Sequence, residues 1–484
     1  MKTRNMLWAA AALLLAACNN EEPAATTPAA GKQVQMTFTA SAPTGAAATR
    51  TALQPGDDTG FHAVYWNPGD EIGIYSVMEP EVPASRTTFT TDLAEPAPTA
   101  TFTGEATEGA MEYVAVYPQD LFIACNNVMG FTMTVFQLPP FQQATAGSFD
   151  SKANIAIAST TDLNGNLTFK NICTLVKFSI KEGCDTQDLE SVMLADCRLY
   201  PLSGLSWMYA EAEGMVMLDS SDGWNPSMTL KGPFEAGKDY YFVVGHNENS
   251  LNSGFFLAFT KNDGTSYVRY SSHGIDKPLV SGTILDLGEI DLSSADYEPQ
   301  ITNLMFIKYV LESKYNTYPW TYNTDGTLPV TGTNLDNIKK ITEIDNAFNC
   351  DKGIIGDLNC LRYFTSLETA KLSSKDIYSL NLSGSVGLKT LDCTNNYLSE
   401  LDLSNNVALE TLQCGNQRDE LGNARELTII LPSSLRDKWE NEWKSDENNV
   451  GVTATFVGDD AQDGSDASHD GFTENSWEGG WDKN

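Results

Sequence analysis

The chain of 484 residues is long enough for about three domains, each with a hydrophobic core of its own. It carries 64 acidic and 30 basic side chains, so its formal net charge is −34. That charge repels phosphate backbones and argues against nucleic acid as a partner. Its four histidines lie in no triad or metal-binding motif, which does not exclude an enzyme but removes the commonest acid, base and metal ligand. We identify no catalytic residue, no metal site and no cofactor.

The N-terminus has the pattern of a secretory signal that ends in a cysteine. Lys2 and Arg4 precede an apolar run over residues 6–17, and Cys18 follows directly. The run is too short to span a bilayer, which takes about 20 residues. Residues 1–18 resemble the signal peptide and lipobox of bacterial lipoproteins. The alternative is an ordinary signal peptide that happens to end near a cysteine.

This resemblance implies that Cys18 becomes the first mature residue and carries acyl chains, which attach the protein to a membrane. The acidic residues of Asn19-Asn20-Glu21-Glu22 resemble an export signal of Gram-negative lipoproteins. We therefore expect an outer-membrane protein that is exposed at the cell surface. Residues 19–33 are rich in Ala, Pro, Thr and Glu, and this composition predicts a flexible tether.

Residues 34–293 have the pattern of short strands separated by turns. From Val34 to Ala40 apolar and polar side chains alternate, as in a strand with one buried face. Asn164-Gly165 and Asp263-Gly264 supply the positive φ that tight hairpin turns need. Further strands are expected over residues 62–66, 71–77, 113–117, 175–180, 240–244 and 255–260. The pattern predicts antiparallel β-sandwiches, and the length of the block suits two of them.

Several motifs follow one another in this block. They are the Val34 to Ala40 strand, Arg50-Thr51-Ala52-Leu53, Val64-Tyr65-Trp66-Asn67-Pro68-Gly69-Asp70-Glu71-Ile72, Ala146-Gly147-Ser148-Phe149-Asp150 and Phe169-Lys170-Asn171-Ile172-Cys173. Their order resembles the fimbrillin-like lipoproteins of type V pilus systems. The resemblance implies two transthyretin-like β-sandwiches, over residues 34–170 and 171–293, and a role as a pilus subunit or surface adhesin.

The family also implies a processing site. In its pilus-forming members, an arginine-specific protease cuts after an early arginine and removes the first strand together with the lipid. Arg50 and Thr51 lie in a stretch of small residues, where a cut is easily made. Cleavage would remove residues 34–40 and open a groove, which a strand from another pilus subunit could fill by strand addition. The alternative is an ordinary loop arginine.

The cysteines other than Cys18 are sparse and form no C-x-x-C pair. They are Cys125, Cys173, Cys184, Cys197, Cys350, Cys360, Cys393 and Cys414. We favour buried free thiols over disulfides or a zinc site.

After Asp291 the composition changes, and residues 294–364 are interpreted as a linker and the N-terminal cap of the region that follows. A helix is expected over residues 302–314. The segment Asn323-Thr324-Asp325-Gly326 resembles a fragment of a calcium loop, but Gly332 stands where such a loop needs its closing acid. We therefore interpret it as a turn.

A repeat of 21 residues covers residues 365–431, where Leu367, Leu388 and Leu409 each begin the same pattern. In the middle copy, the frame falls on Leu388, Leu391, Cys393, Asn396 and Leu398. The chain here resembles a bacterial leucine-rich-repeat domain, which is a short solenoid. Lys375 replaces the asparagine in the earlier copy. Gln417 replaces it in the later copy, which we expect to lose register.

About three repeats are close to the minimum for stability, so both ends of the solenoid must be capped. The C-terminal cap is expected over residues 432–457, with Ser433 and Ser434 capping a short helix and a closing strand over residues 450–457. Residues 458–484 are acidic and rich in Gly and Ser, which predicts a disordered tail. Calcium binding by this tail is a weaker alternative.

The residues between the frame positions are expected to face outward on the concave side of the solenoid. They are Thr369, Lys371, Ser373, Thr390, Asp392, Thr394, Thr411, Gln413 and Gly415. Small polar side chains of this kind suit a protein or glycan met over a broad area, and they form no deep pocket. The alternative is that the repeats serve only as a spacer.

The sequence as a whole predicts a mainly β protein with two sandwiches followed by a short solenoid. Its expected function is that of a lipid-anchored surface adhesin or binding protein with a ligand on another cell. The second interpretation is an accessory or tip subunit of a type V pilus. A surface hydrolase of glycans or peptides, which would use a pair of carboxylates, is a third and weaker one.

Overall fold

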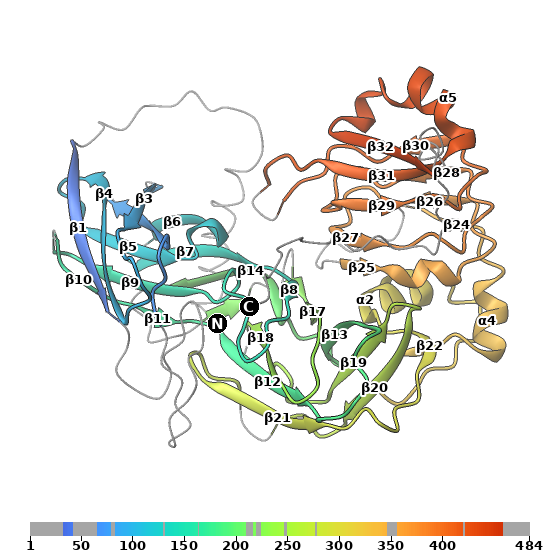
Figure 1. Ribbon diagram of the computed structural model, residues 1–484, viewed down its shortest axis with the longest axis horizontal. Coiled ribbons are helices and arrows are strands. Elements are labelled where there is room, and N and C mark those ends of the chain that lie inside the picture. The colour runs from blue at the N-terminus through green and yellow to red at the C-terminus, as the bar shows by residue number, and fades with distance from the viewer. Residues whose placement is uncertain are drawn as a thin grey trace, which may run out of the picture.

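The computed structural model describes residues 32–41, 65–78, 83–128, 131–162, 164–209, 216–218, 224–245, 249–275, 278–345, 356–419 and 422–457. Within these ranges the protein is mainly β (Figure 1). Sheets from the first half of the chain lie on one side, a second group of sheets lies in the middle, and stacked coils lie on the other side. No helix in the described ranges combines the length and the hydropathy that a membrane crossing requires.

The first sheet has eight strands. In spatial order they are β10 (Asn166–Thr168), β1 (Gln33–Ser41), β4 (Thr99–Thr107), β3 (Ser85–Thr91), β2 (Glu71–Val77), β5 (Glu112–Tyr117), β9 (Ala156–Thr160) and β11 (Lys170–Asn171). The alternation expected for the first strand is confirmed, since β1 buries Met36, Phe38 and Ala40. Their cluster also contains Trp66, whose ring meets Phe102 edge-on at 5.0 Å.

The second sheet packs against the other face of the first. Its strands are β15 (Val216–Leu218), β14 (Ser203–Tyr209), β7 (Phe131–Leu138) and β6 (Phe122–Val128), with β16 (Trp224–Asn225) beside β14, and η2 (Gln119–Leu121) leads into β6. Tyr75 and Val114 of the first sheet share one hydrophobic cluster with Phe136 of β7. The same cluster continues into the middle of the molecule, so this face of the first sheet shares one core with the second sheet and the middle sheets.

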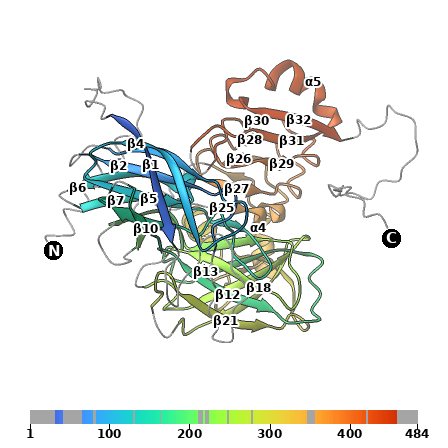
Figure 2. The same cartoon turned by 60° about the vertical axis from the view of Figure 1, so that its left-hand side comes forward.

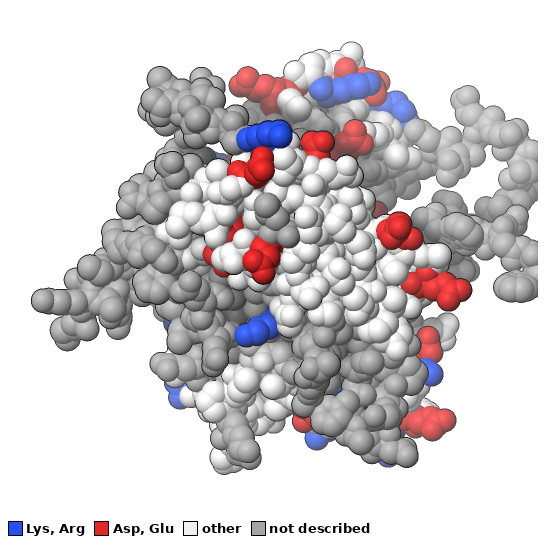
Figure 3. Space-filling view, turned by 90° about the vertical axis from the view of Figure 1, so that its left-hand side faces the viewer, with Lys and Arg blue, Asp and Glu red and all other residues white. Residues whose placement is uncertain are grey.

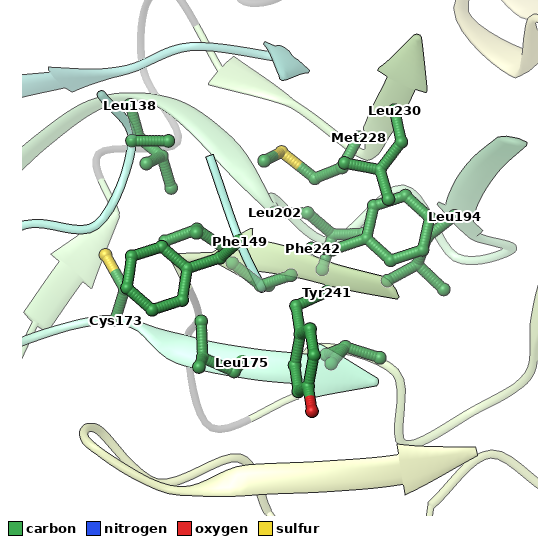
Figure 4. Packing of buried hydrophobic residues seen from close by; sticks show 14 of the residues in the cluster. Leu138, Phe149, Cys173, Leu175, Leu194, Leu202, Met228, Leu230, Tyr241 and Phe242 are labelled. Carbon is green, nitrogen blue, oxygen red and sulfur yellow. The ribbon is translucent and has the colours of Figure 1, made fainter. Parts of the chain in front are cut away.

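Two further sheets face each other in the middle. The third sheet comprises β18 (Asp239–Val244), β12 (Thr174–Ile180) and β21 (Ile284–Ile290). The fourth comprises β23 (Leu328–Pro329), β22 (Glu298–Ile301), β20 (Thr265–Ser271), β19 (Phe255–Lys261), β13 (Leu189–Asp196), β17 (Ser227–Lys231) and β8 (Phe141–Gln143). Figure 4 shows Leu175 and Phe242 of the third sheet beside Leu194 and Met228 of the fourth, in one continuous core.

Two strand pairings cross residue 170, where the sequence suggested a boundary between sandwiches. β8 precedes that residue but pairs in parallel with β17, with Phe141 opposite Thr229. β14 follows it but pairs with β7, with Gly204 opposite Leu138. The segments over residues 34–170 and 171–293 therefore exchange strands.

The predicted strands and turns agree with the structure wherever it describes them. The strands expected over residues 71–77, 113–117, 175–180, 240–244 and 255–260 are β2, β5, β12, β18 and β19. The φ angles of Asn164 and Gly264 are 59° and 83°, as a tight turn requires. Most of the strand expected over residues 62–66 lies outside the described residues, although Trp66 forms a bridge with Ala97.

Residues 298–457, here named the coil region, contain two rows of parallel strands. The first row is β24 (Glu343–Ile344), β26 (Thr369–Lys371), β28 (Thr390–Asp392) and β30 (Thr411–Gln413). The second row holds β25 (Gly356–Leu358) paired with β27 (Ile377–Leu380), and β29 (Glu400–Asp402), β31 (Leu427–Pro432) and β32 (Val452–Val457) paired in that order. In the first row Thr369 pairs with Thr390, and Thr390 pairs with Thr411. This register agrees with the 21-residue period of the sequence.

Buried side-chain amides connect successive coils. Asn396 donates to the backbone carbonyls of Leu372 and Cys393, both at 2.9 Å, and accepts the N–H of Lys375 at 2.9 Å. Gln417 donates in the same way to Cys393 and Cys414, at 2.9 and 2.8 Å. The expected loss of the 21-residue register follows directly after Gln417, since Glu400 of β29 pairs with Thr428 of β31, 28 positions later. Glutamine carries the same amide group as asparagine and continues the ladder.

The coil region joins the fourth sheet without a flexible linker. β22 pairs with β20 on one side and with β23 of the coil region on the other. The helix expected over residues 302–314 is present as α2 (Leu304–Phe306), η3 (Ile307–Leu311) and α3 (Glu312–Lys314), and Asn303 caps it. Asn323 to Thr327 form the expected turn, in which Thr327 N–H donates to Asp325 at 2.8 Å. Two short helices complete this end, α4 (Gly332–Ile338) and η4 (Asn359–Tyr363).

The other end of the coil region is closed by a helical segment. It comprises η5 (Ser433–Leu435), α5 (Arg436–Lys438) and η6 (Trp439–Trp443), and η7 (Glu447–Asn449) precedes the last strand, β32. Trp439 and Trp443 are buried in the coil core. The expected serine cap is wrong, because Pro432 occupies the N-cap position of this segment and makes no side-chain hydrogen bond to it. Hydrophobic anchoring by the two tryptophans holds the segment in place instead.

Candidate binding surfaces

The face predicted to bind a partner lies on the first row of strands. Seven of its nine residues are exposed or half-exposed: Thr369, Lys371, Ser373, Thr390, Asp392, Thr411 and Gln413. Pairing in register places Thr369, Thr390 and Thr411 in one line, with Lys371, Asp392 and Gln413 in the next. The structure thus brings these seven residues together on one surface.

The remaining two residues are buried. Thr394 is 6% exposed, and both its hydroxyl and its N–H donate to Asp392, at 2.8 and 3.1 Å. Gly415 lies under the C-terminal cap, where its N–H donates to Asn448 O at 2.7 Å. A Cβ at Gly415 would come within 2.5 Å of Val450 N. Strand alternation ends at Asp392 and Gln413, so the outward pattern does not extend to these two residues.

Charges of alternating sign flank this face. Lys389 forms an ion pair with Glu368 at 2.8 Å, and Glu410 lies one further coil along. The hydrogen bond from Lys389 to Glu368 and their attraction raise the pKa of the Lys389 ammonium, and Glu410 adds to that effect. The three charges repeat at the period of the coils, so this border of the face is polar and nearly neutral.

A ladder of aromatic rings lies on the second row and was not predicted. Tyr378 and Tyr397 stack at 4.5 Å with an angle of 5° between their planes, and Phe141 of β8 lies 5.0 Å from Tyr378. Arg418 lies 4.9 Å from the Tyr397 ring and Lys231 5.5 Å from the Phe141 ring. Each ring therefore has two neighbours, and the ladder stabilises the contact between β8 and the coil region.

A polar cavity of about 70 Å³ lies where the fourth sheet meets the coil region. Glu190, Asp357, Arg362 and Asn303 contribute to its walls. Burial raises the pKa of Glu190, and the nearby carboxylate of Asp357 raises it further. Burial likewise raises the pKa of Asp357, against the opposing effect of the Asn359 N–H that donates to it. The cavity holds two carboxylates that resist ionisation, beside one guanidinium.

The ladder and the cavity carried no signal in the sequence. Tyr378 and Tyr397 are 19 residues apart, so a search at a period of 21 residues passes over them. Glu190 and Asp357 come from different sheets and are separated by more than 160 residues. Only the folded chain shows that residues so far apart in the sequence lie in one cavity.

The described cysteines lie mostly inside the protein. Cys125, Cys173, Cys184, Cys393 and Cys414 are buried and are present as free thiols, and Cys197 and Cys360 are half-buried free thiols. Burial raises the pKa of Cys393 and Cys414 above the ordinary range of a thiol. Cys350 lies outside the described residues.

Three predicted site residues also lie outside the described residues: Cys18, Arg50 and Thr51.

Figure 3 shows the face of the molecule that carries the first sheet. Among the described residues of that face, lysine and arginine are scattered singly between acidic and uncharged residues and form no basic patch. A phosphate backbone would find no complementary field there.

Comparisons with known proteins give the following results. No protein-family model matches the sequence, and no curated protein matches it. Among solved structures, a candidate cell adhesion protein from Bacteroides uniformis is similar, with 15% identity over 56% of this chain and 97% of that chain, and a TM-score of 0.32. A candidate cell adhesion protein from Bacteroides ovatus is similar with 14% identity over 55% of this chain and 95% of that chain, and a TM-score of 0.31.

Proposed function

We propose that the protein is a lipid-anchored adhesin or binding protein of the cell surface. In this proposal two transthyretin-like, fimbrillin-like sandwiches form a stalk, and the coil region is a leucine-rich-repeat solenoid that contacts a protein or glycan on another cell. The observation that carries the proposal is the set of seven exposed or half-exposed polar side chains on the first row, six of which are aligned in register.

Rigidity supports a binding role for this face. The amides of Asn396 and Gln417 tie each coil to the one before it. Asn449 ties the last coil to the cap, donating to Leu412 O and Trp443 O at 3.0 Å and accepting the N–H of Cys414. Side chains held on such a scaffold lose little freedom when a partner binds, and this lowers the cost of association.

The direct test adds bulk and charge to the face. In the double variant Thr390→Arg and Thr411→Arg, we expect binding of the chain to cultured epithelial cells and to immobilised mucin glycans to fall by about tenfold or more, because both side chains lie at the centre of the face. The matched control is Asn405→Arg with Val407→Arg, which adds the same charge at exposed positions between β29 and β30. Equal binding by both double variants would contradict the proposal.

The lipid anchor has a test of its own. Replacement of Cys18 by serine removes the thiol to which acyl chains would attach. We expect the variant Cys18→Ser to leave the outer-membrane fraction, whereas Cys393→Ser should stay with it. Retention of the Cys18→Ser protein in the membrane would contradict lipid anchoring.

A second candidate function, as accessory or tip subunit of a type V pilus, is favoured by the place of β1. That strand lies between β4 and β10 and covers a core with Phe38 and Ala40. If the chain is cut between Arg50 and Thr51, β1 separates from the body and the groove it leaves can accept a strand from another subunit. Mass spectrometry of the mature protein shows whether this cut occurs, because a mature chain that begins at Thr51 supports processing. Unheated gels then distinguish polymers, which run as ladders, from a single band.

A further inference from the structure

The last strand of the second row, β32, has a partner on one side only. Among the described residues it pairs with β31, from Leu427 opposite Val452 to Pro432 opposite Val457. In Figures 1 and 2 it lies at the far end of the coil region, beside α5. Its other edge forms the limit of the sheet that contains β29 and β31.

The hydrogen-bonding groups on that edge can be assigned. Leu427 N–H donates to Gly451 O at 2.8 Å, so Gly451 directs its backbone groups towards β31. Backbone direction alternates along a strand, and the N–H and C=O of Val452, Ala454 and Phe456 therefore point away from β31. These groups have no hydrogen-bond partner within the described part of the chain.

Three other strand edges in the described part of the chain are protected. At the same end of the coil region, Asn449 caps β30 by accepting the Cys414 N–H at 2.8 Å. Gln142 covers the edge of β18 through two bonds to Val243, at 2.8 and 2.9 Å. β21 carries Asp286 and Glu289, and its pairing with β12 is interrupted by a bulge. Charges, bulges and side-chain caps are the usual means by which an edge is kept from pairing with another chain.

The residues of β32 themselves have none of these features, although the Arg436 guanidinium of the cap lies 4.1 Å from the Phe456 ring. Its residues Val452–Val457 contain no charge, no proline and no glycine, and four of the six are β-branched. In the sheet behind it, acids occur only on β29, as Glu400 and Asp402, two strands away from the edge. A long, uncharged and β-branched edge is a template for pairing with a further strand.

We propose that the free edge of β32 pairs with β32 of a second copy of this chain, antiparallel about a two-fold axis. Val452, Ala454 and Phe456, which are half-buried against the coil core, would then be covered by their counterparts. The pairing gives an isologous interface, in which the same strand serves both copies. It places two coil regions end to end.

The charges of the chain favour a second copy as the partner of β32, and they favour antiparallel pairing. With a net charge of −34, two copies repel each other least where they meet at a surface without acids, and the residues of β32 include none. Residues 458–484 follow β32 and contain eight acids. Antiparallel pairing sends these segments out at opposite ends of a strand of about 17 to 20 Å, which exceeds the Debye length of about 8 Å. Parallel pairing would start them about 4.8 Å apart.

Residues 458–484 of the same chain would be a poor partner for β32. Residues 458–484 contain a single β-branched residue, Thr473, and no alternation of apolar and polar side chains. A strand formed from them would bring acids against the edge without burying apolar surface. The second copy offers a matching strand, which residues 458–484 do not.

Sedimentation equilibrium of residues 19–484 tests the pairing. We expect twice the mass of one chain at high protein concentration. Thr453→Lys places a charge at the exposed edge and should raise the dissociation constant of the dimer by about tenfold or more. The control Thr411→Lys adds the same charge to β30, whose edge is capped, and should leave the dissociation constant unchanged. Ala454→Pro, which removes an outward N–H, should also give monomers.

Circular dichroism of each variant confirms that the coils remain folded. A wild-type chain that stays monomeric at every concentration overturns the proposal, as do equal effects of Thr453→Lys and Thr411→Lys. Slow amide exchange at Val452, Ala454 and Phe456 in a monomer would show that the chain's own residues cover the edge, and this too overturns it. Fast exchange in the monomer that slows in the dimer supports it.

Discussion

The sheets of the first 293 residues and the coil region are both built of strands, but they bring together residues at very different distances along the chain. In the first sheet, β1 pairs with β10 so that Thr39 lies opposite Asn166. In the first row of the coil region, residues of β26, β28 and β30 pair with residues 21 positions away, as Thr390 does with Thr411. Because the coils depend on near neighbours, damage to one coil should stay local, whereas damage to the shared core of the sheets should spread.

The first prediction concerns that shared core. Phe178 is fully buried between Phe242 and Phe259, at 5.6 and 6.0 Å. Phe178→Ala should lower the free energy of unfolding by about 4 kcal/mol, because it removes a large side chain and leaves a cavity. Hydrogen exchange should become faster in β2 and β7 as well as in β12, since one cluster joins these strands.

Ile123, 47% exposed on β6, provides the control. Ile123→Ala should change the free energy of unfolding by less than about 0.5 kcal/mol. Faster exchange confined to residues 171–293 in Phe178→Ala would show that the two halves are separate units despite their exchanged strands.

The second prediction concerns the amide ladder of the coils. Asn396→Ala should destabilise the coil region by about 3 kcal/mol, because it leaves the buried carbonyls of Leu372 and Cys393 and the N–H of Lys375 without partners. Hydrogen exchange should become faster in β26, β28 and β30 and remain unchanged in β12. Asn405→Ala removes an exposed amide between the same coils and should have little effect. Faster exchange throughout the sheets would contradict the local character of the coils.

The third prediction concerns the junction between the two regions. Gly264 has a φ of 83°, and a Cβ there would lie 2.1 Å from the Arg362 guanidinium. Gly264→Ala should cost about 2 kcal/mol, measured by chemical denaturation, because it combines backbone strain with displacement of Arg362. Gly183→Ala has a similar φ of 84° and open space around it, so it should cost about 1 kcal/mol. Equal losses would mean that the contact with Arg362 contributes nothing to the junction.

The fourth and smallest prediction concerns pH. The raised pKa values of Glu190 and Asp357 mean that the folded protein binds their protons more tightly than the unfolded chain does. Their contribution to stability is therefore full at low pH. It declines as the pH rises from about 4 through the raised pKa values, and it is absent above them. Glu190→Gln should make the protein more stable than wild type near neutral pH, by about 1 kcal/mol.

Urea denaturation of the two proteins at several pH values measures this difference. Near pH 4 the wild-type and Glu190→Gln chains should have nearly the same free energy of unfolding. Glu298→Gln, at an exposed position on β22, is the control and should follow the wild type at every pH. A constant difference between wild type and Glu190→Gln across the pH range would show that ionisation in the cavity is unimportant.

The difference in contact range also explains what could be predicted from the sequence. The first strand, Gln33–Ser41, followed from alternation, and the register of the coils followed from the spacing of Leu367, Leu388 and Leu409. The exchange of β8 and β14 between the two halves did not, because alternation shows that a strand has a buried face but does not identify its partner. The junction cavity remained hidden for the same reason.

The candidate face was predicted in large part. Six of the seven residues follow from strand alternation. Ser373, Thr394 and Gly415 lie just beyond the ends of β26, β28 and β30, where alternation no longer applies, and of these three only Ser373 is half-exposed. The loss of the 21-residue register after the third copy was predicted, but the ability of Gln417 to replace asparagine in the ladder was not. Its amide makes the same bonds as that of Asn396, and the longer side chain is accommodated.

The ladder of Asn396, Gln417 and Asn449 has a consequence for the size of the molecule. Each amide bonds to the coil before it and to its own coil, so one further unit of 21 residues would find both kinds of carbonyl already in position. Every added unit would carry the last strand outward by about 4.8 Å, while the core of the sheets stays as it is. The reach of the coil region from the sheets is thus adjustable in fixed increments, by duplication of a single short stretch of sequence.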